Sequence, residues 1–152
     1  MIKLIKLKVL IVGMRGLGVE TAKNLVLAGP ASVSLYDPKI VSINDLGANF
    51  YLNESHVGKL SRAASSLDQL KDLNPNVKVS AIDKLSLEDH LDYDVVCYTE
   101  NFEGIDHLIQ VNQFCRANKK GFILSETLGA AGYTFIDFGD NHIVSDADGE
   151  FT

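Results

Sequence analysis

The sequence contains little of what a disulfide scaffold, a zinc site or a nucleic-acid-binding protein requires. Its 152 residues include two cysteines, three prolines and no tryptophan. Two cysteines are too few for a disulfide framework or a paired-cysteine zinc site, so we expect a reducing cytoplasmic or nuclear setting. Lysine and arginine total 14 against 20 acidic residues, which gives a net charge of −6. With no basic run in addition, nucleic acid is not an expected partner.

Long hydrophobic runs are also missing. No apolar segment approaches the length of a membrane span, and we expect neither a membrane partner nor a secretory leader. The composition, with 46% hydrophobic and 22% charged residues, is typical of a globular domain. At this length we expect one domain with a substantial core.

A glycine-rich turn near the N-terminus organises the rest of the sequence. It follows a β-branched apolar run over residues 9–12, precedes an amphipathic stretch over residues 16–28, and contains Gly13, Gly16 and Gly18. Strand, tight turn and helix in this order begin many doubly wound α/β domains. The first N–H groups of a helix lack partners, and glycines let a phosphate approach them closely. The turn therefore predicts a nucleotide site.

Arg15 interrupts this fingerprint. A dinucleotide or ATP site of the GxGxxG type has a glycine at this position, where the backbone touches the pyrophosphate. An arginine there either clamps a phosphate or fills the pocket and blocks close approach. We favour the blocking interpretation, because a side chain removes the reason for the glycine.

The remaining pattern predicts an α/β fold. Hydrophobic periodicity and Gly or Pro stop signals predict helices over 16–28, 59–73 and 104–118, and strands over 8–12, 33–37, 77–82, 94–98 and 121–126. A polar loop over 39–58 follows the second strand, and connections of this length are usually functional. The closely spaced runs 132–138 and 142–145 predict an antiparallel β-hairpin. The fold class is therefore Rossmann-like in three layers, with a parallel βαβ core and antiparallel edge strands.

Two carboxylates stand where such folds bind ligands. Asp37 ends the second strand, about twenty residues beyond the glycine turn, which is the position of a carboxylate that binds ribose hydroxyls. Aspartate before proline is equally typical of a turn, and both interpretations stay open. Glu100 follows the fourth strand and either holds Mg²⁺ beside a phosphate or caps the strand in solvent.

The histidines and cysteines do not predict catalysis. No spacing indicates a serine, histidine and acid constellation. We expect solvated histidines at His56, His90, His107 and His142. Cys97 and Cys115 lie among apolar neighbours, which is typical of small core residues.

With these residues in view, the chain resembles the adenylation fold of the ubiquitin-activating enzyme E1 family, which it shares with the bacterial ThiF and MoeB proteins. The resemblance covers about residues 9–150. Its most specific stretches are GMRGLGVE (13–20), AKN (22–24), DLGANF (45–50), SETLG (125–129) and DFGD (137–140). The chain is most similar to the first, inactive adenylation half of the ubiquitin enzyme, and the corresponding subunit of the SUMO-type enzyme is the near alternative.

The resemblance implies a partly dismantled nucleotide site. In this family the active half uses Mg·ATP to adenylate the ubiquitin C-terminus, and a cysteine in another domain then forms a thioester. Here Arg15 replaces a glycine, Asp45 stands at an asparagine position, and Ala48 stands where the family has a phosphate-binding arginine.

Several positions match the family's nucleotide-binding pattern. By resemblance, Asp37 matches the ribose carboxylate, Glu100 replaces the metal-binding aspartate, and either Lys59 or Arg62 matches the lysine at the start of the second helix. The implied vestigial site comprises Gly13, Arg15, Gly16, Gly18, Asp37, Lys59, Arg62 and Glu100. It carries no catalytic residue and no metal, because ATP and Mg²⁺ would be bound mainly by the active half.

Residues 1–152 are therefore expected to form a single inactive ThiF-type adenylation half-domain of a longer, multidomain, ATP-dependent ligase. Its expected partners are the active adenylation half and ubiquitin or a ubiquitin-like protein. Two other functions are weighed against this one. An NAD-binding dehydrogenase domain is suggested by the glycine turn and Asp37 but opposed by Arg15. An active homodimeric enzyme acting on a sulfur-carrier protein is opposed by Ala48 and by the lack of paired CxxC motifs.

Overall fold

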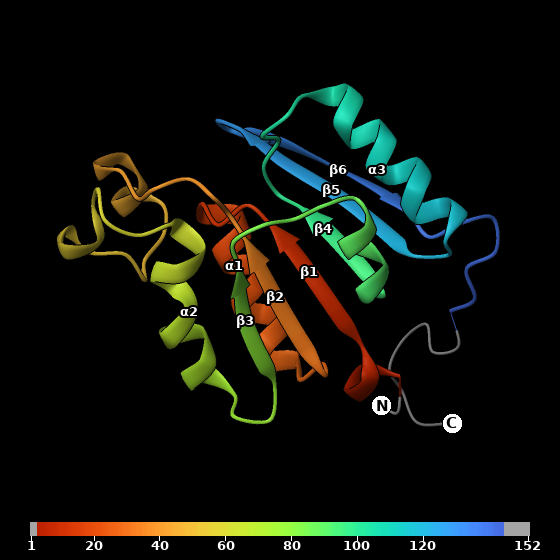
Figure 1. Cartoon of the computed structure of the whole chain (residues 1–152), viewed down its shortest axis with the longest axis horizontal. Helices are drawn as coiled ribbons and strands as arrows, with labels where there is room; N and C mark the ends of the chain where they lie inside the picture. The colour runs from red at the N-terminus through yellow and green to blue at the C-terminus, as the bar shows by residue number, and fades with distance from the viewer. Residues whose placement is uncertain (1–2, 145–152) are drawn as a thin grey trace.

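Six strands in the described part of the chain form one mixed sheet in the order β3-β2-β1-β4-β5-β6 (Figure 1). The computed structural model describes residues 3–144. The first five strands are parallel and β6 runs antiparallel to β5. The strands are β1 (Lys8–Val12), β2 (Ser32–Tyr36), β3 (Lys78–Ile82), β4 (Val95–Tyr98), β5 (Gly121–Leu128) and β6 (Ala131–Asp137). Since β1 and β4 are neighbours, the order of the strands reverses between them, which defines the switch point of the sheet.

Helices cover both faces of this sheet. Helices α1 (Gly16–Ala28) and α2 (Arg62–Leu73) pack on one face against β1, β2 and β3, and α3 (Ile105–Ala117) packs on the other against β5 (Figure 1). Short 3₁₀ turns, η1 (Leu4–Lys6), η2 (Ile43–Gly47), η3 (Glu54–His56) and η4 (Glu88–Asp92), lie in the connections. In the described part of the chain, none of the helices has the length and apolar character needed to cross a bilayer.

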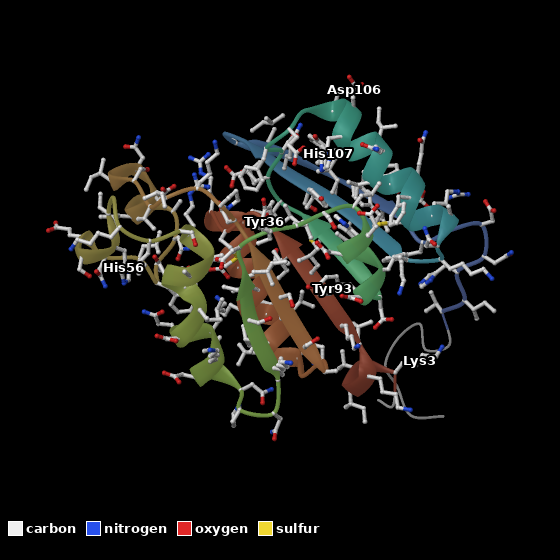
Figure 2. The ribbon with its side chains drawn as sticks, viewed as in Figure 1. Lys3, Tyr36, His56, Tyr93, Asp106 and His107 are labelled. Carbon is white, nitrogen blue, oxygen red and sulfur yellow. The ribbon has the colours of Figure 1, made fainter. Side chains whose placement is uncertain are left out.

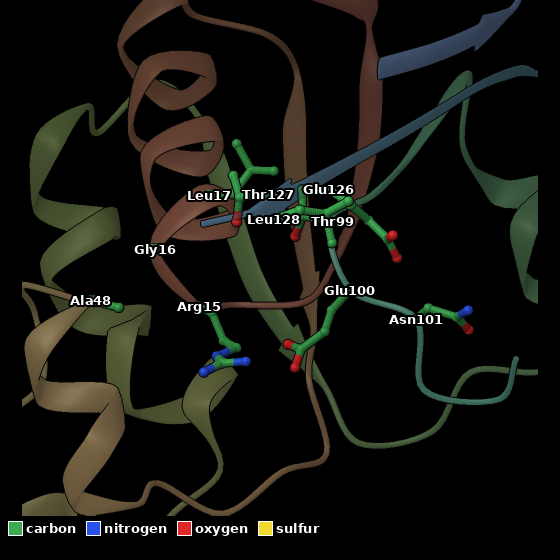
Figure 3. Close-up of a pocket in the computed structure, with 10 residues that line it drawn as sticks. All are labelled: Arg15, Gly16, Leu17, Ala48, Thr99, Glu100, Asn101, Glu126, Thr127 and Leu128. Atoms are coloured by element: carbon green, nitrogen blue, oxygen red, sulfur yellow. The ribbon is translucent and has the colours of Figure 1, made fainter. Parts of the chain in front are cut away.

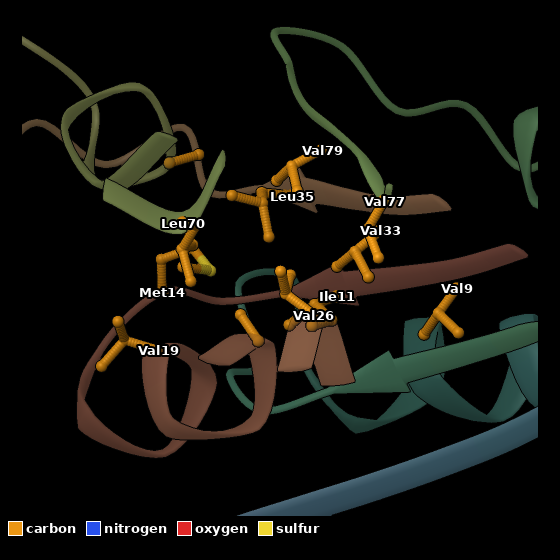
Figure 4. Packing of buried hydrophobic residues seen from close by; sticks show 12 residues of the cluster. Val9, Ile11, Met14, Val19, Val26, Val33, Leu35, Leu70, Val77 and Val79 are labelled. Carbon is orange, nitrogen blue, oxygen red and sulfur yellow. The ribbon is translucent and has the colours of Figure 1, made fainter. Parts of the chain in front are cut away.

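The apolar run of β1 is buried on both sides. Val9 and Ile11 pack with α1 and α2 in one core cluster, shown in Figure 4. Leu10 and Val12 face the opposite way and pack with α3 in a second cluster. Burial on both faces explains why this strand is continuously hydrophobic. The predicted α/β class, with a parallel core and an antiparallel edge, is confirmed.

The predicted hairpin is wrong in its pairing. The antiparallel partner of β6 is β5, joined to it by the two-residue turn Gly129–Ala130, and residues 142–144 form no strand. Residue 145, the last of the predicted strand, lies outside the described residues. Arg116 on α3 forms ion pairs with both Asp137 and Asp140, so the chain directly after β6 lies against the helix.

The predicted start of the second helix is three residues early. Helix α2 begins at Arg62, and Ser61 is its N-cap, with its hydroxyl accepting the N–H of Ala64 at 3.2 Å. Lys59 lies before this cap and is exposed. An N-capping hydroxyl satisfies one of the first N–H groups, so it fixes where the helix can begin.

The prediction of a solvated histidine is wrong for His90, which is buried. Its residue exposure is 1%, whereas His56 lies out on the β2–α2 connection and His107 lies on α3 (Figure 2). The Nδ1 atom of His90 lies 2.9 Å from the carbonyl oxygen of Ser86, and Nε2 lies 2.9 Å from the hydroxyl of Tyr98. A carbonyl can only accept, so Nδ1 carries the proton and the Tyr98 hydroxyl donates to Nε2.

Stability should fall in acid because of His90. Burial lowers the pKa of its imidazole below the ordinary 6.5, although the carbonyls of Ser86 and Leu87 oppose this effect. The unfolded chain then binds more protons than the folded one, so the contribution is complete above the ordinary pKa and is lost as pH falls below it. We expect urea unfolding to show this loss in the wild type and not in His90→Asn. The variant should also be about 1–3 kcal/mol less stable at pH 8, because Tyr98 loses its acceptor. Parallel pH profiles for the two proteins would contradict the assignment.

Candidate functional site

A cavity of about 500 Å³ opens at the switch point of the sheet (Figure 3). Three chain segments and Ala48 line it, namely Arg15 to Leu17 in the β1–α1 turn, Thr99 to Asn101 after β4, and Glu126 to Leu128 at the end of β5. These segments lie at the carboxyl ends of the parallel strands, where open α/β sheets bind their ligands.

Two glycines allow α1 to start directly against the sheet. A Cβ on Gly18 would lie 1.9 Å from the carbonyl oxygen of Gly13, which no side chain can accept. Gly13 has φ +99°, and a Cβ there would lie 2.6 Å from the Cβ of Glu100. The hydroxyl of Thr99 donates to the Gly13 carbonyl at 2.9 Å and fastens the turn to the end of β4. The glycines thus have a packing role whether or not a phosphate binds.

Arg15 lies at the mouth of the cavity. It is the N-cap of α1 with extended backbone, and its side chain is 56% exposed. The guanidinium Nε lies 3.8 Å from a carboxylate oxygen of Asp45, and Figure 3 shows the side chain pointing in the same direction as Glu100. Its position permits either predicted role, phosphate clamp or block, and both stay predictions.

Arg62 lies at the centre of an ion cluster behind this cavity. The residue is 9% exposed and occupies the first turn of α2. Its Nη1 donates to Asp37 at 3.2 Å and to Glu100 at 2.8 Å, and its Nε lies 3.2 Å from Asp45. The three carboxylates come from the end of β2, the η2 turn and the segment after β4. Of the two predicted equivalents of the family's lysine, Arg62 lies in the cluster and Lys59 is exposed outside it.

Both oxygens of the Asp37 carboxylate accept hydrogen bonds from the chain. One oxygen accepts the N–H of Met14 at 2.8 Å as well as Arg62, and the other accepts the N–H of Lys39 at 3.0 Å. Burial raises the pKa of the Asp37 carboxyl, although the Met14 N–H and the Arg62 guanidinium oppose this effect. The bond to Lys39 is the turn that aspartate before proline predicts.

The other two carboxylates differ in how they are held. Burial tends to raise the pKa of Asp45, but hydrogen bonds from the N–H and hydroxyl of Ser42, together with Arg62, outweigh it, so the pKa lies below its ordinary value. Burial raises the pKa of Glu100 above its ordinary value, with Arg62 opposing. The cluster holds three acidic groups around one buried base, and among residues 3–144 no group of His, Cys, Asp or Glu side chains is arranged to hold a metal ion.

Asn49 is a buried polar residue whose role sequence reasoning missed. Its amide donates to the carbonyl of Met14 at 2.9 Å and to the hydroxyl of Ser66 at 3.0 Å, and its oxygen accepts the N–H of Tyr51. It thereby joins the β1–α1 turn to α2. An asparagine in an otherwise irregular stretch is the signal that could have indicated it, because Asn side chains commonly bond nearby backbone.

Replacing Arg62 by a neutral residue should lower the free energy of unfolding. Arg62→Met leaves two buried carboxylates, Asp37 and Asp45, and the partly exposed Glu100 without their counter-charge, and we expect a loss of about 3–5 kcal/mol in the free energy of unfolding at pH 7. Lys59→Met makes the same charge change at an exposed site and should cost at most about 0.5 kcal/mol. The deficit of Arg62→Met should shrink at pH 5, because protonation relieves the repulsion. Equal urea midpoints for the two variants would contradict a central role for Arg62.

Comparison with known proteins agrees with this architecture. The ThiF family model matches residues 1–145. The chain is 39% identical over 150 residues to a protein named ubiquitin-activating enzyme E1 1 from Candida albicans, covering 99% of this chain and 14% of that protein. It is 40% identical over 149 residues to ubiquitin-like modifier-activating enzyme 1 from Dictyostelium discoideum, covering 97% and 14%.

A third relative is shorter. The chain is 39% identical over 143 residues to SUMO-activating enzyme subunit 1 from Rattus norvegicus, covering 91% of this chain and 40% of that protein. The chain therefore spans less than half the length of each of these relatives. The predicted resemblance is confirmed at the level of the family, and with a family match over nearly all its residues on a switch-point α/β sheet, the chain belongs to the ThiF family.

Proposed function

We propose that this chain is the non-catalytic adenylation half of a ubiquitin-activating type of enzyme. In this role it pairs with an active half and supports it, while the whole enzyme uses Mg·ATP to activate ubiquitin or a ubiquitin-like protein. The relatives named ubiquitin-activating enzyme support the choice of pathway. The SUMO-type subunit is the second candidate, favoured by the larger share of that relative which the chain covers.

The observation that carries the proposal is the charge balance of the site, where acidic side chains of the chain itself offset the positive charges that a phosphate would need. Adenylation requires cationic groups placed where negative charge develops on the phosphate. Of the residues that line the cavity, Arg15 is basic, Glu100 and Glu126 are acidic, and Ala48 contributes no charge. The other nearby base, Arg62, already forms ion pairs with Asp37, Asp45 and Glu100.

These residues fit a nucleoside triphosphate poorly. The cavity offers the N-terminus of α1 and one guanidinium to a polyanion, and two carboxylates repel it. No adenylation step is therefore assigned to side chains of this chain. The same geometry argues against an NAD-dependent dehydrogenase, because Asp37 is 1% exposed, pairs with Arg62 and does not line the cavity.

A pairing role requires exposed apolar surface. The β2–α2 connection, residues 37–61, carries several large exposed apolar side chains, Ile40, Ile43, Phe50 and Leu60. The Arg62 cluster holds this connection at Asp37 and Asp45, so its surface is presented on a rigid base. We propose that these side chains together form the pairing surface, since large exposed apolar patches are typical of protein–protein contacts.

Calorimetric titration tests the nucleotide part of the proposal. We expect no binding heat when the folded chain is titrated with Mg·ATP or, separately, with NAD. The double variant Arg15→Gly/Ala48→Arg is the matched comparison, because it restores two of the features of the family site, the glycine and the phosphate-binding arginine, and it should gain measurable affinity for Mg·ATP. Micromolar binding of Mg·ATP by the wild-type chain, with ubiquitin-dependent exchange of pyrophosphate into ATP, would overturn the proposal.

Co-purification tests the pairing part. The active adenylation half of a related ubiquitin-activating enzyme, produced as a separate chain, should form a one-to-one complex with this chain. Ile43→Asp and Phe50→Asp should weaken the complex, since each places a charge on the apolar connection surface. Leu27→Asp, an equally exposed position on α1, is the control and should leave it unchanged. Equal weakening by all three variants would argue against this surface.

A further inference from the structure

The connection from β3 to β4 is attached to the sheet by one buried side chain. Residues 83–94 leave the end of β3 and cross the face of the sheet that α3 covers, with η4 as their regular structure (Figure 1). His90 is the single residue of this segment that is buried. Among the hydrogen bonds of the described residues, the one that ties 83–93 to another part of the chain joins His90 Nε2 to the Tyr98 hydroxyl. Crossovers in parallel sheets are usually helices that bury an apolar face, whereas this one is held by an ionisable group.

Little apolar surface lies beneath the second half of this connection. Val33 and Leu35 pack in the core cluster of α1 and α2. Since side chains alternate along a strand, Ser32 and Ser34 lie on the α3 face of β2. These serines and Tyr93 of the connection line a hollow of about 550 Å³. Atoms beside an unfilled space lose contacts, so the hollow weakens the attachment of the connection.

The first half of the connection covers a cavity of about 20 Å³ at the other end of the sheet. Tyr36 and Phe102 line this cavity together with His90 and form an edge-to-face pair, with ring centroids 6.3 Å apart. Tyr36 directly precedes Asp37, and Phe102 follows Glu100 by two residues. The connection therefore packs against the same ends of β2 and β4 that supply two carboxylates to the ion cluster.

Protonation of His90 would remove the anchor. In the neutral form, Nδ1 donates to the carbonyl of Ser86 and Nε2 accepts the proton of the Tyr98 hydroxyl. A proton on Nε2 takes away that acceptor and places a positive charge at a residue that is 1% exposed. The phenols of Tyr98 and Tyr36, which line the same cavity, cannot balance the charge, because burial raises the pKa of each above the ordinary 10.0.

The charged groups around His90 do not offset this cost. Asp89, beside it on η4, favours the charged imidazole, whereas His107 on α3 opposes it. Glu103 lies 3.6 Å from His107, measured from Oε2 to Nδ1. The remaining acids of η4 are exposed, Glu88 and Asp92. Burial has the largest effect, so the pKa of His90 lies below the ordinary 6.5 while the connection is closed, and a fall in pH favours opening.

We propose that residues 83–94 act as an acid-released strap: protonation of His90 breaks its contact with Tyr98, and the strap lifts from the sheet while the strands and helices stay folded. Opening uncovers the β1 side chains on the α3 face, Leu10 and Val12, and the ends of β2 and β4. The candidate site thereby gains a response to acid from the opposite face of the sheet. This inference goes beyond the proposed function and depends on neither nucleotide binding nor pairing.

Amide hydrogen exchange on the isotope-labelled chain, followed by NMR, tests the strap. The reporters are the amides of His90 and Tyr93, which donate to carbonyls of the strap itself, and the references are the amides of Leu10 and Ile11 in β1. Global unfolding also uncovers His90, so urea dependence is what separates the two processes. We expect the reporters to exchange through an opening that low urea concentrations barely change, whereas the β1 amides follow urea-dependent unfolding.

The pH dependence of the reporters identifies the titrating group. After correction for intrinsic exchange rates, the opening constant should rise by up to about tenfold for each pH unit below the ordinary pKa of 6.5, because opening takes up one proton. His90→Asn should open about tenfold more often at neutral pH and lose this dependence. His142→Asn makes the same change at an exposed histidine and should behave as the wild type.

Tyr98→Phe tests the anchor without removing the histidine. It keeps the aromatic ring and deletes the hydroxyl that bonds Nε2, so the strap should open about tenfold or more often at every pH. Its pH dependence should remain, because His90 is still buried. The wild-type profile and this variant keep the test decisive where His90→Asn does not fold.

Four results would each overturn the proposal. Reporter amides that follow the β1 amides in urea would mean that the strap does not open by itself. A wild-type opening constant that is independent of pH would remove the acid response. An unchanged pH dependence in His90→Asn would assign the response to another group, and equal opening of Tyr98→Phe and the wild type would mean that the hydroxyl is not the anchor.

Discussion

The buried guanidinium of Arg62 is the interaction on which the switch-point region depends. It joins the end of β2, the η2 turn and the segment after β4 through Asp37, Asp45 and Glu100. A charge removed from water is tolerated when it is paired and hydrogen-bonded, and here one base serves three acids. Asp37 extends the network to the glycine turn through the Met14 N–H. The long β2–α2 connection is therefore anchored to the sheet by electrostatics as well as by packing.

This cluster also shows how a fold can keep its architecture while its site changes. The sheet order, the glycine turn and the cavity are those of a ligand-binding α/β domain. The carboxylates that could serve a ligand there bind Arg62 instead, and Ala48 leaves the cavity without a second base. Function belongs to sites and not to folds, so a member of the ThiF family need not carry an adenylation site of its own.

Two parts of the surface differ in what they present. The β2–α2 connection presents exposed apolar side chains on a base fixed by Arg62, whereas β6 is the last strand of the sheet among residues 3–144. The physical difference matters, because apolar side chains tolerate many partner shapes while a strand edge requires a particular register. The Arg116 contacts with Asp137 and Asp140 join the end of β6 to α3.

The sequence by itself determined the element types, the parallel core and the glycine turn, because apolar periodicity and Gly or Pro stops act over a few residues. It did not determine the partner of β6, because a local alternation such as that of 142–145 does not indicate which strand it joins. Nor could it show that His90 is buried, or that Asp37, Asp45 and Glu100 converge on Arg62. These residues are up to 63 positions apart, and only tertiary packing brings their charges within hydrogen-bond distance, where burial makes each pairing obligatory.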